Sequence, residues 1–520
     1  MSKLAVIAFS ALAALVLAAP ATSALVVGAT DDRGRDEPSR TTTFLDAMRD
    51  VGLTENRLAI IWNPDQPRTI PDKALLDAYV AQATARQLRL VFAVYPGNAR
   101  VLTDYPEAPG EFVDFLQLVA RSYPSVRDFI IGNEPNQPRF WQPQFTQAGV
   151  PVACRQYTPL LARSYDALKA VNPAITVIGI ALSPRGNDNA TAQSNISTSP
   201  VRCIRDIGAA YRASRRQRPL MDELSFHPYP ERDTHPLNRG YTWPKAGVVN
   251  LDRIKQAIWD AFHGTGQPVF AEPGQSVILP SLTFRLDEVG WQVTVPPAAR
   301  QAYFGRESVV TTDEAAQARI YAEAVRFLAC DPSVKSMLFF GFVDEPDLER
   351  WQAGLMRADW SRRPSYDSVK RAVAETQGRC TARPVAWRHK TKVVGAVWRP
   401  GLPRTRQQRT SWTFAAKVGE DALYRAGVLR VRSKRSVPAR GKRAIGQLLQ
   451  GRTPGILFRR GIVRAPFGKV FRLGPRRMKP GYYVLATLLQ AEMNSRRTSL
   501  FVSRPFRIAP AKAAKPKPKK

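Results

Sequence analysis

The segment FIIGNEPN, residues 129–136, contains the features that decide the fold of this chain. Its apolar residues 129–131 predict a short strand buried on both faces, and Gly132 and Pro135 mark where that strand ends. Glu134 therefore stands at the carboxyl end of a buried strand. The catalytic groups of β/α barrels occupy this position. The segment predicts such a barrel, with a carboxylate on its active end.

A second segment, LTFRLDEVGW at 282–291, places Glu288 at the end of another strand. Because neighbouring side chains of a strand point to opposite sides, Asp287 is expected to face the helix layer. Two glutamates on different strands suit a retaining glycosidase, in which the carboxyl groups are about 5–5.5 Å apart. In that chemistry Glu134 protonates the leaving oxygen as acid/base, and Glu288 attacks the sugar carbon as nucleophile.

The remainder of residues 25–380 supplies the elements of a (β/α)8 TIM barrel, which needs eight apolar strands alternating with amphipathic helices. The predicted strands cover residues 25–30, 57–62, 89–95, 128–133, 176–181, 222–227, 282–288 and 334–342. The predicted helices lie near residues 41–51, 72–86, 110–122, 156–170, 202–213, 250–263, 313–329 and 364–376. A further run, 268–274, contains Glu272. A strand there would make nine, so we interpret it as an insertion and prefer Glu288 as the nucleophile.

The Asn-Glu-Pro tripeptide after the fourth strand and Asp-Glu-x-Gly-Trp after the seventh resemble the clan A glycoside hydrolases, especially families 5 and 39. The resemblance covers about residues 25–380. It implies an O-glycosyl hydrolase acting on bonds expected to be β-linked, with Asn133 binding the sugar 2-hydroxyl. The segment SFHPYP resembles the family's H-x-Y element, which implies that the Tyr229 hydroxyl contacts the nucleophile. His227 and Tyr229 are two residues apart, so both can face the barrel axis.

Large aromatic side chains that could stack on sugar faces, or that could instead pack at the barrel rim, follow several strands. They are Trp62, Trp291 and Trp351. Many clan A members carry a tryptophan near the end of strand eight, where this chain has Phe340 and Phe342. Asp344 and Glu345 follow, either as acceptors for sugar hydroxyls or as solvated charges.

A catalytically silent carbohydrate- or cell-wall-binding protein on the same barrel is the alternative to an enzyme, since a fold does not establish an activity. Glu134 would then be a surface residue of a turn, and Asn133 would cap local backbone. The presence of both glutamates together with Asn133, His227 and Tyr229 favours the enzyme.

Four cysteines allow three pairings. In the predicted barrel Cys154 and Cys203 lie in adjacent loops above strands four and five, and Cys330 and Cys380 lie at the ends of the last two helices. These two pairs are therefore expected in an oxidising compartment. The spacing resembles no zinc site, and the four histidines form no ligand cluster in the sequence. Neither a metal nor a cofactor is expected.

The amino-terminal residues 1–24 are typical of a secretory signal peptide. Lys3 provides the positive start, residues 4–19 are apolar, and small residues near Ser23 and Ala24 suit cleavage. A membrane anchor is the alternative, but the apolar run is shorter than the roughly 20 residues of a spanning helix. The protein is therefore expected to be secreted.

Charge divides the chain sharply near residue 380. Residues 381–520 contain 35 Lys and Arg and three acids, a net charge of +32, whereas the whole chain carries +34. Such a charge implies an anionic partner, such as a cell-wall polymer, acidic polysaccharide or anionic lipid. A merely soluble surface is the alternative. A nucleic acid partner is disfavoured because no recognition motif is present.

Residues 385–510 lack helical periodicity and contain short strand-like runs separated by turn signals. These runs cover residues 392–398, 427–432, 455–460, 481–489 and 498–508. They predict a small all-β sandwich, and the run KPGYYVLA resembles a strand of the Ig-like modules on bacterial surface proteins. The tail 511–520 is too charged to fold alone.

Overall fold

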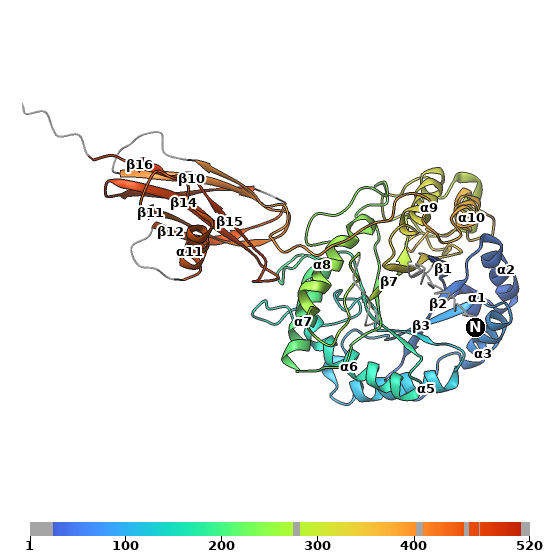
Figure 1. Ribbon diagram of the computed structural model, residues 1–520. Coiled ribbons are helices and arrows are strands. Elements are labelled where there is room, and N and C mark those ends of the chain that lie inside the picture. The colour runs from blue at the N-terminus through green and yellow to red at the C-terminus, as the bar shows by residue number, and fades with distance from the viewer. Residues whose placement is uncertain (1–23, 274–280, 402–408, 452–456, 467, 511–520) are drawn as a thin grey trace, which may run out of the picture.

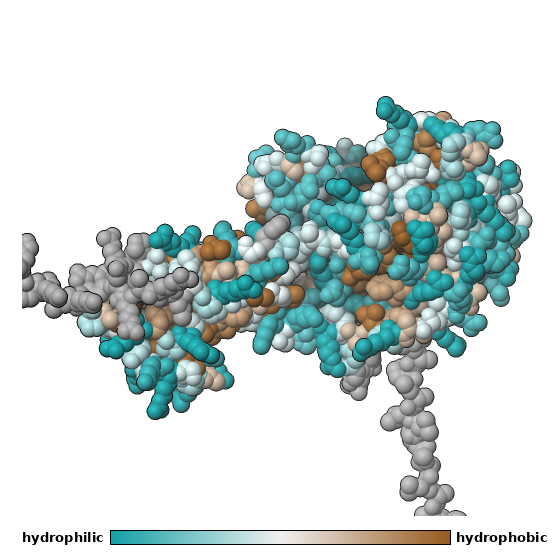
Figure 2. Space-filling view, turned by 90° about the horizontal axis from the view of Figure 1, so that it is seen from above, coloured by the Kyte–Doolittle hydropathy of each residue, from teal (hydrophilic) through white to brown (hydrophobic). Residues whose placement is uncertain are grey.

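The computed structural model describes residues 24–273, 281–401, 409–451, 457–466 and 468–510. Two lobes are visible in Figure 1: a β/α barrel and an all-β lobe that projects from it beside helices α7 and α8. Figure 2 shows the two lobes from above, with hydrophilic side chains over most of the barrel surface in view. Ala24 apart, the predicted signal peptide lies outside the described residues, as does the tail 511–520.

Eight parallel strands close into a barrel in the order of the sequence, because β1 pairs with both β2 and β8. The strands are β1 (Val26–Thr30), β2 (Glu55–Trp62), β3 (Arg89–Pro96), β4 (Asp128–Ile131), β5 (Thr176–Leu182), β6 (Glu223–Phe226), β7 (Thr283–Val289) and β8 (Val334–Phe340). The predicted TIM barrel is confirmed, and no predicted strand end differs from the observed one by more than two residues.

Helices surround this barrel (Figure 1) and bury one apolar face each against the strands. The longer ones are α2 (Thr41–Val51), α3 (Lys73–Ala85), α5 (Ala108–Ser122), α6 (Ala153–Val171), α7 (Pro200–Ala213), α8 (Leu251–Phe262), α9 (Glu314–Leu328) and α10 (Pro364–Thr376). Two single turns, α1 (Arg33–Asp36) and α4 (Val101–Asp104), and three 3-10 segments, at Pro38–Arg40, Val248–Asn250 and Pro297–Ala302, lie in the loops. Asp313 caps α9 by accepting a hydrogen bond from the backbone of Ala316.

The amino-terminal end of the barrel interior is ionic. Glu55, Asp128 and Glu223 are the first residues of β2, β4 and β6, so alternate strands supply one layer of side chains. The fully buried Arg285 of β7 lies between them, with Nη2 2.9 Å from Glu223 and 3.3 Å from Asp128, and Nη1 bonded to Glu55. This cluster seals the end of the barrel opposite to Glu134 and Glu288.

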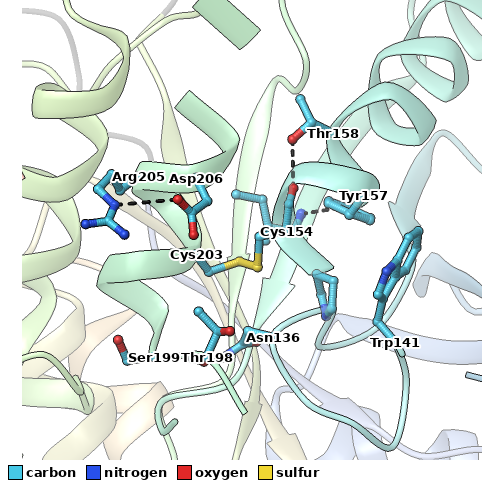
Figure 3. The surroundings of a disulfide bond; sticks show 12 residues. Asn136, Trp141, Cys154, Tyr157, Thr158, Thr198, Ser199, Cys203, Arg205 and Asp206 are labelled. Carbon is cyan, nitrogen blue, oxygen red and sulfur yellow. Dashed lines mark hydrogen bonds and ion pairs between the residues drawn. A yellow bond between two sulfur atoms is a disulfide. The ribbon is translucent and has the colours of Figure 1, made fainter. Parts of the chain in front are cut away.

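Both expected disulfides are present. Cys154–Cys203 joins α6 to α7, and Cys330–Cys380 joins the end of α9 to the segment after α10. Figure 3 shows the first bond beside Asn136, on the loop that follows β4. Each bond therefore links two consecutive helices of the outer layer.

The all-β lobe consists of antiparallel strands in two sheets, as predicted. One sheet has the order β13-β10-β9, from β9 (Val397–Gly401), β10 (Arg409–Lys417) and β13 (Gly468–Arg477). The other has the order β12-β11-β14-β15, from β11 (Ala422–Val431), β12 (Leu457–Val463), β14 (Gly481–Ala491) and β15 (Thr498–Val502), with β16 (Phe506–Ile508) also pairing with β14. Buried aromatic side chains such as Trp412, Phe414 and Phe471 contribute to the core of this lobe.

Helix α11 (Ala439–Gln450) was not predicted, and in this respect the expectation of a purely strand-like region is wrong. Its buried residues are Ile445 and Leu449, four positions apart, and they belong to an apolar cluster with Leu429 and Val484 of β11 and β14. Two buried positions give too short a repeat to stand out in the sequence. Strands β10 and β13 were also missing from the predicted set.

The two lobes meet at α7 and α8. The Arg497 guanidinium lies 2.7 Å from Asp260 of α8 and 2.6 Å from Glu420. The indole of Trp259 is stacked by the imidazole of His389, with ring centroids 4.1 Å apart. Glu272 accepts a hydrogen bond from the backbone of His389 at 2.8 Å. Glu272 therefore belongs to the junction between the lobes.

Candidate active site

The loop after β4 turns sharply and presents Glu134 at the carboxyl end of the barrel. Gly132 and Glu134 both have left-handed backbone, with φ of 77° and 36°. The Glu134 amide donates to the carbonyl of Ala181 at 2.9 Å, and the Tyr157 hydroxyl donates to the carbonyl of Ile131 at 2.6 Å. Left-handed backbone is costly for a glutamate, and such strain is concentrated at functional sites.

Asn136 fixes the same loop to the neighbouring strand connection. Its amide nitrogen donates to the carbonyls of Ser183 at 3.2 Å and Thr198 at 2.9 Å, and its oxygen accepts from the Ser183 amide at 3.0 Å. Asn136 and Thr198 lie beside the Cys154–Cys203 disulfide (Figure 3). The position of Glu134 is therefore held by buried hydrogen bonds on both sides of the turn.

Glu288 occupies the corresponding position on β7, and its carboxylate is almost completely buried. The Tyr229 hydroxyl donates to Oε2 at 2.8 Å, and the Arg57 guanidinium lies 3.0 Å from Oε1. Tyr229 comes from the loop after β6, two residues beyond His227. The contact between Tyr229 and Glu288 that the family resemblance implied is therefore present.

His227 lies between the two glutamates. Its Nδ1 atom is 3.0 Å from Oε1 of Glu134 and 3.4 Å from Oε2 of Glu288, and its Nε2 atom is 3.3 Å from Asp287. One oxygen of Glu134 and one oxygen of Glu288 lie within 4.8 Å of each other. Two strands that are far apart in the sequence therefore place their carboxylates face to face.

The expectation for Asp287 is wrong, because this side chain points into the barrel. It lies 3.0 Å from Arg57 and accepts a hydrogen bond from the Ser225 hydroxyl. Arg285 and Asp287 keep the two-residue period along β7 and both face the axis. The register of β7 against β8 shifts between Leu286 and Val289. This irregularity allows Glu288 to reach the axis as well.

Arg57 of β2 was missed by sequence reasoning. Besides its two ion pairs with Asp287 and Glu288, its Nη2 atom donates to Oδ1 of Asn133 at 2.9 Å. The one available signal was a charged residue at the start of the apolar strand segment RLAIIW. A fully charged side chain is rarely buried unless it is paired, so Arg57 in a buried strand indicates a buried carboxylate partner.

The pKa values of the site reflect burial and mutual charge. Burial alone lowers the pKa of His227, but Glu288 and Asp287 outweigh it and raise the value to about 10. Burial raises the pKa of Asp287, but His227 and Arg57 lower it overall. For Glu288 burial dominates and raises the pKa, although His227 and Arg57 act in the opposite direction. His227 is therefore a cation at neutral pH.

Glu134, His227 and Glu288 also offer three donor atoms at the spacing of a metal site. A metal ligand histidine must be neutral, whereas the raised pKa of His227 keeps it protonated at neutral pH. The Arg57 guanidinium adds a second positive charge 3.0 Å from Glu288. Arg57 therefore already supplies positive charge beside these three donor atoms.

Two tryptophans expected at the sugar site are placed elsewhere. Trp62 is fully buried and packs edge-on against Phe112, with ring centroids 5.6 Å apart. Trp291 is 2% exposed, and its indole nitrogen donates to the carbonyl of His235 at 2.9 Å. Both side chains are buried in the core, so neither offers an open ring face for stacking on a sugar, although Trp62 contributes to the wall of a cavity at the ends of β2 and β3.

Trp351, from the loop after β8, is the tryptophan that reaches the site. It is partly exposed, and its ring centroid lies 4.9 Å from that of Tyr229 and 5.4 Å from that of Phe340. Asp344, by contrast, is fully buried against Arg363. It is neither a solvated charge nor a sugar acceptor, because it fixes the loop that carries Trp351.

Comparison with known proteins gives similarity of fold. No family model matches the chain, and no curated protein matches it. A family 39 glycoside hydrolase from Bacteroides cellulosilyticus WH2 is 16% identical with a TM-score of 0.47, covering 88% of this chain and 81% of its own. A GH39 β-xylosidase from Caulobacter crescentus is 14% identical with a TM-score of 0.42, covering 88% and 96%. An endo-1,4-β-mannanase from Rhizomucor miehei is 13% identical with a TM-score of 0.42, covering 68% and 96%. At these scores the similarity carries no argument on substrate or mechanism.

Proposed function

We propose that this protein is a retaining glycoside hydrolase with Glu134 as acid/base and Glu288 as nucleophile. The proposal rests on one observation, the separation of less than 4.8 Å between oxygens of the two carboxylates. Retaining enzymes hold their carboxyl groups about 5–5.5 Å apart, whereas inverting enzymes need about 6.5–9.5 Å to admit a water molecule. The shorter class of spacing supports double displacement.

The surroundings of each carboxylate support the division of roles. Glu288 accepts a hydrogen bond from Tyr229 and pairs with Arg57, and both contacts favour its ionised form against the burial that raises its pKa. Among the described residues, the Glu134 carboxylate has one polar contact, with His227. It is also more exposed than Glu288. Glu134 therefore stands nearer the mouth of the site, where a leaving group departs.

The reaction then takes two steps. The Glu288 carboxylate attacks the anomeric carbon and forms a glycosyl ester, while Glu134 gives its proton to the departing oxygen. In the second step Glu134 takes a proton from water, the water oxygen attacks the same carbon, and Glu288 leaves. Asn133 accepts from Arg57 through its oxygen, and its amide nitrogen is thus directed to donate to the sugar 2-hydroxyl.

An activated 2-fluoro-glycoside tests this proposal directly. The first step is expected to trap the sugar on Glu288, so that mass spectrometry finds the label in the peptide 282–291. Labelling of Glu272 would refute the assignment. NMR analysis of the first product with aryl β-glycosides checks both the linkage and the retained anomeric configuration. An inverted product would refute double displacement.

We further propose that the enzyme acts outside the cell. Disulfides such as Cys154–Cys203 and Cys330–Cys380 persist in oxidising compartments and are rare in the cytosol. Among the residues that the structure describes, no helix has the length and apolar character that a membrane crossing needs. Mass spectrometry of the exported protein, expected to begin near Ala24, checks the proposed signal peptide.

The basic lobe is proposed to bind an anionic cell-wall polymer. The three acids of residues 381–520 all lie at the junction with the barrel, where Glu420 pairs with Arg497 and Asp421 with Arg464. The third, Glu492, lies 3.4 Å from Arg202 of α7. The part of the lobe beyond this junction thus carries bases without acids, which favours polyanion binding.

A further inference from the structure

A cavity of about 760 Å3 opens at the carboxyl ends of β2 and β3, and neither Glu134 nor Glu288 lines it. Its walls come from Ile61 and Trp62, from the loop 63–71, from Gly97 and Asn98, and from the segment 101–111. Catalysis as proposed above uses none of these residues. The size is that of a small-molecule site.

One lining residue, Ile61, relates the cavity to the inner face of the barrel. Along β2, Glu55 and Arg57 face the barrel axis, so Ile61 faces it as well. Ile61 lies four residues beyond Arg57, about 13 Å along the strand. Its register partner is Tyr95 of β3, whose hydroxyl is close enough to Arg57 and Glu288 for their charges to affect its pKa. Ile61, at the wall of the cavity, and Tyr95, near Glu288, are therefore neighbours on the inner face of the sheet.

The lining combines an exposed aromatic face with hydrogen-bonding groups. Tyr105 is 56% exposed and Ile61 is 37% exposed. The polar side chains that line the cavity are Asn63, Asp65, Gln66, Thr69, Asn98, Glu107 and Glu111. The lining contains three carboxylates and neither lysine nor arginine, although the chain as a whole has a net charge of +34. Arg68 and Arg100 belong to the same loops without lining the cavity, so it is the wall itself that is acidic.

We propose that this cavity is a distal subsite that holds a neutral sugar unit of an oligosaccharide bound across Glu134 and Glu288. This inference rests on the proposed function and specifies its substrate. The ring of Tyr105 supplies a flat apolar surface for one face of the sugar. The carboxylates and amides accept and donate hydrogen bonds around its edge. Three carboxylates repel acidic sugars, which gives the cavity its selectivity.

One consequence is that substrate and anchoring polymer are different glycans. The cavity excludes negative charge, whereas the basic lobe attracts it. The enzyme is thus expected to cleave a neutral chain of several units while held on an anionic polymer. The anchoring polymer would then not compete for the catalytic cleft.

Binding by the full-length Glu288→Gln variant tests the subsite without turnover, and Glu134→Gln serves as a second inactive background. Calorimetry is carried out with cello-, xylo- and manno-oligosaccharides of two to six units. For the series that binds, affinity is expected to rise as the chain becomes long enough to reach the cavity. Length-independent affinity, or no binding by any series, would overturn the subsite.

Substitution of Tyr105 then tests whether the gain in affinity with chain length comes from this cavity. Tyr105→Ala in the Glu288→Gln background is expected to weaken binding of the hexamer about tenfold and to leave binding of the dimer within about twofold. Tyr105→Phe keeps the ring and is expected to bind like the parent. Equal loss for dimer and hexamer, or no loss for either, would contradict the assignment.

Charge selectivity gives an independent check. Because oligogalacturonates are also expected to bind the basic lobe, the cavity is tested by competition: an excess of oligogalacturonate is expected not to displace the bound neutral hexamer, and Glu107→Gln with Glu111→Gln is expected to allow some displacement. Equal displacement from both proteins would refute the role of the carboxylates. Turnover of aryl glycosides by the wild-type protein tests the proposed function separately. Tyr105-dependent binding without turnover would reject the hydrolase and leave the subsite standing.

Discussion

At the scale of single residues, the candidate site is a balance between two cations and three carboxylates. Arg57 and the protonated His227 face Glu134, Glu288 and Asp287. One negative charge is left without a matching cation, so one proton is readily held within the cluster. A single transferable proton is what an acid/base residue needs.

The two glutamates are expected to respond differently to removal. Glu288→Ala should lose nearly all turnover, because no nucleophile remains. Glu134→Ala should keep activity on aryl glycosides with good leaving groups, which need little protonation, and should gain activity on addition of azide. Steady-state kinetics with a series of aryl glycosides, whose leaving groups differ in acidity, measure the loss of turnover in each variant. An equal loss on every substrate would contradict the two roles.

The raised pKa of His227 predicts that the stability of the protein depends on pH. Its pKa is raised from 6.5 to about 10 by Glu288 and Asp287 against the effect of burial. A group with a raised pKa in the folded state stabilises the protein fully below its unfolded value. That contribution is lost as the pH rises from about 6.5 through about 10.

The free energy of unfolding, measured in urea between pH 6 and pH 10, is therefore expected to fall more steeply for the wild type than for His227→Gln. The variant has no titrating group at this position, so it serves as the matched control. Parallel profiles for the two proteins would show that His227 is neutral in the folded state.

Sequence reasoning reached some residues of the site and not others. Glu134 was predicted because it stands at a recognisable strand end, and Tyr229 because SFHPYP resembles the H-x-Y element of the clan A glycoside hydrolases. Arg57 and Asp287 were not assigned to the site, because a strand irregularity and a buried ion pair between β2 and β7 are visible only in three dimensions. Trp62 was misplaced because an aromatic residue at a strand end packs inward as readily as it faces a ligand.

At the scale of elements, the barrel was predictable because every strand is a short apolar run and every long helix has one apolar face. The β lobe was less predictable from its sequence. In β10 the buried Trp412, Phe414 and Ala416 alternate with more exposed residues, but the sequence that precedes this alternation is basic. Helix α11 packs on β11 and β14 through only two buried residues out of twelve, so its own sequence shows a weak helical pattern.

The ionic layer at the amino-terminal end of the barrel ties β2, β4, β6 and β7 together. Arg285→Met is expected to destabilise the fold by about 3–5 kcal/mol, because it leaves the carboxylates of Glu55, Asp128 and Glu223 buried without their shared partner. Urea unfolding measures this loss. Arg350→Met, at an exposed pair with Glu345, is the control and should cost at most about 1 kcal/mol.

At the scale of the whole molecule, charge is distributed by lobe. Residues 381–520 carry a net charge of +32, and their three acids are all engaged at the junction with α7 and α8. A basic patch lies beyond that junction, on the loop before α11 and its first turn. It comprises the exposed side chains of Arg432, Lys434, Arg435, Arg440, Lys442 and Arg443. Within the described chain none of the six pairs with an acid.

The basic patch is expected to carry much of the binding to anionic wall polymers. Changing Lys434, Arg435 and Arg443 to glutamine should weaken binding of the full-length protein to wall material about tenfold. Binding of the wild type should fall steeply as salt rises past ~0.15 M, where screening acts over about 8 Å. Sedimentation with wall material before and after extraction of its anionic polymers measures both effects.

The control removes the same charge from another place. Arg49, Arg215 and Arg319 are exposed on the barrel, and no acid pairs with them among the described residues. Changing these three to glutamine lowers the net charge equally, so a general attraction between protein and wall would weaken by the same amount in both variants. Loss confined to the patch variant would locate the contact on the β lobe. Binding that persists at high salt in all three proteins would contradict an electrostatic anchor and indicate a shaped recognition site.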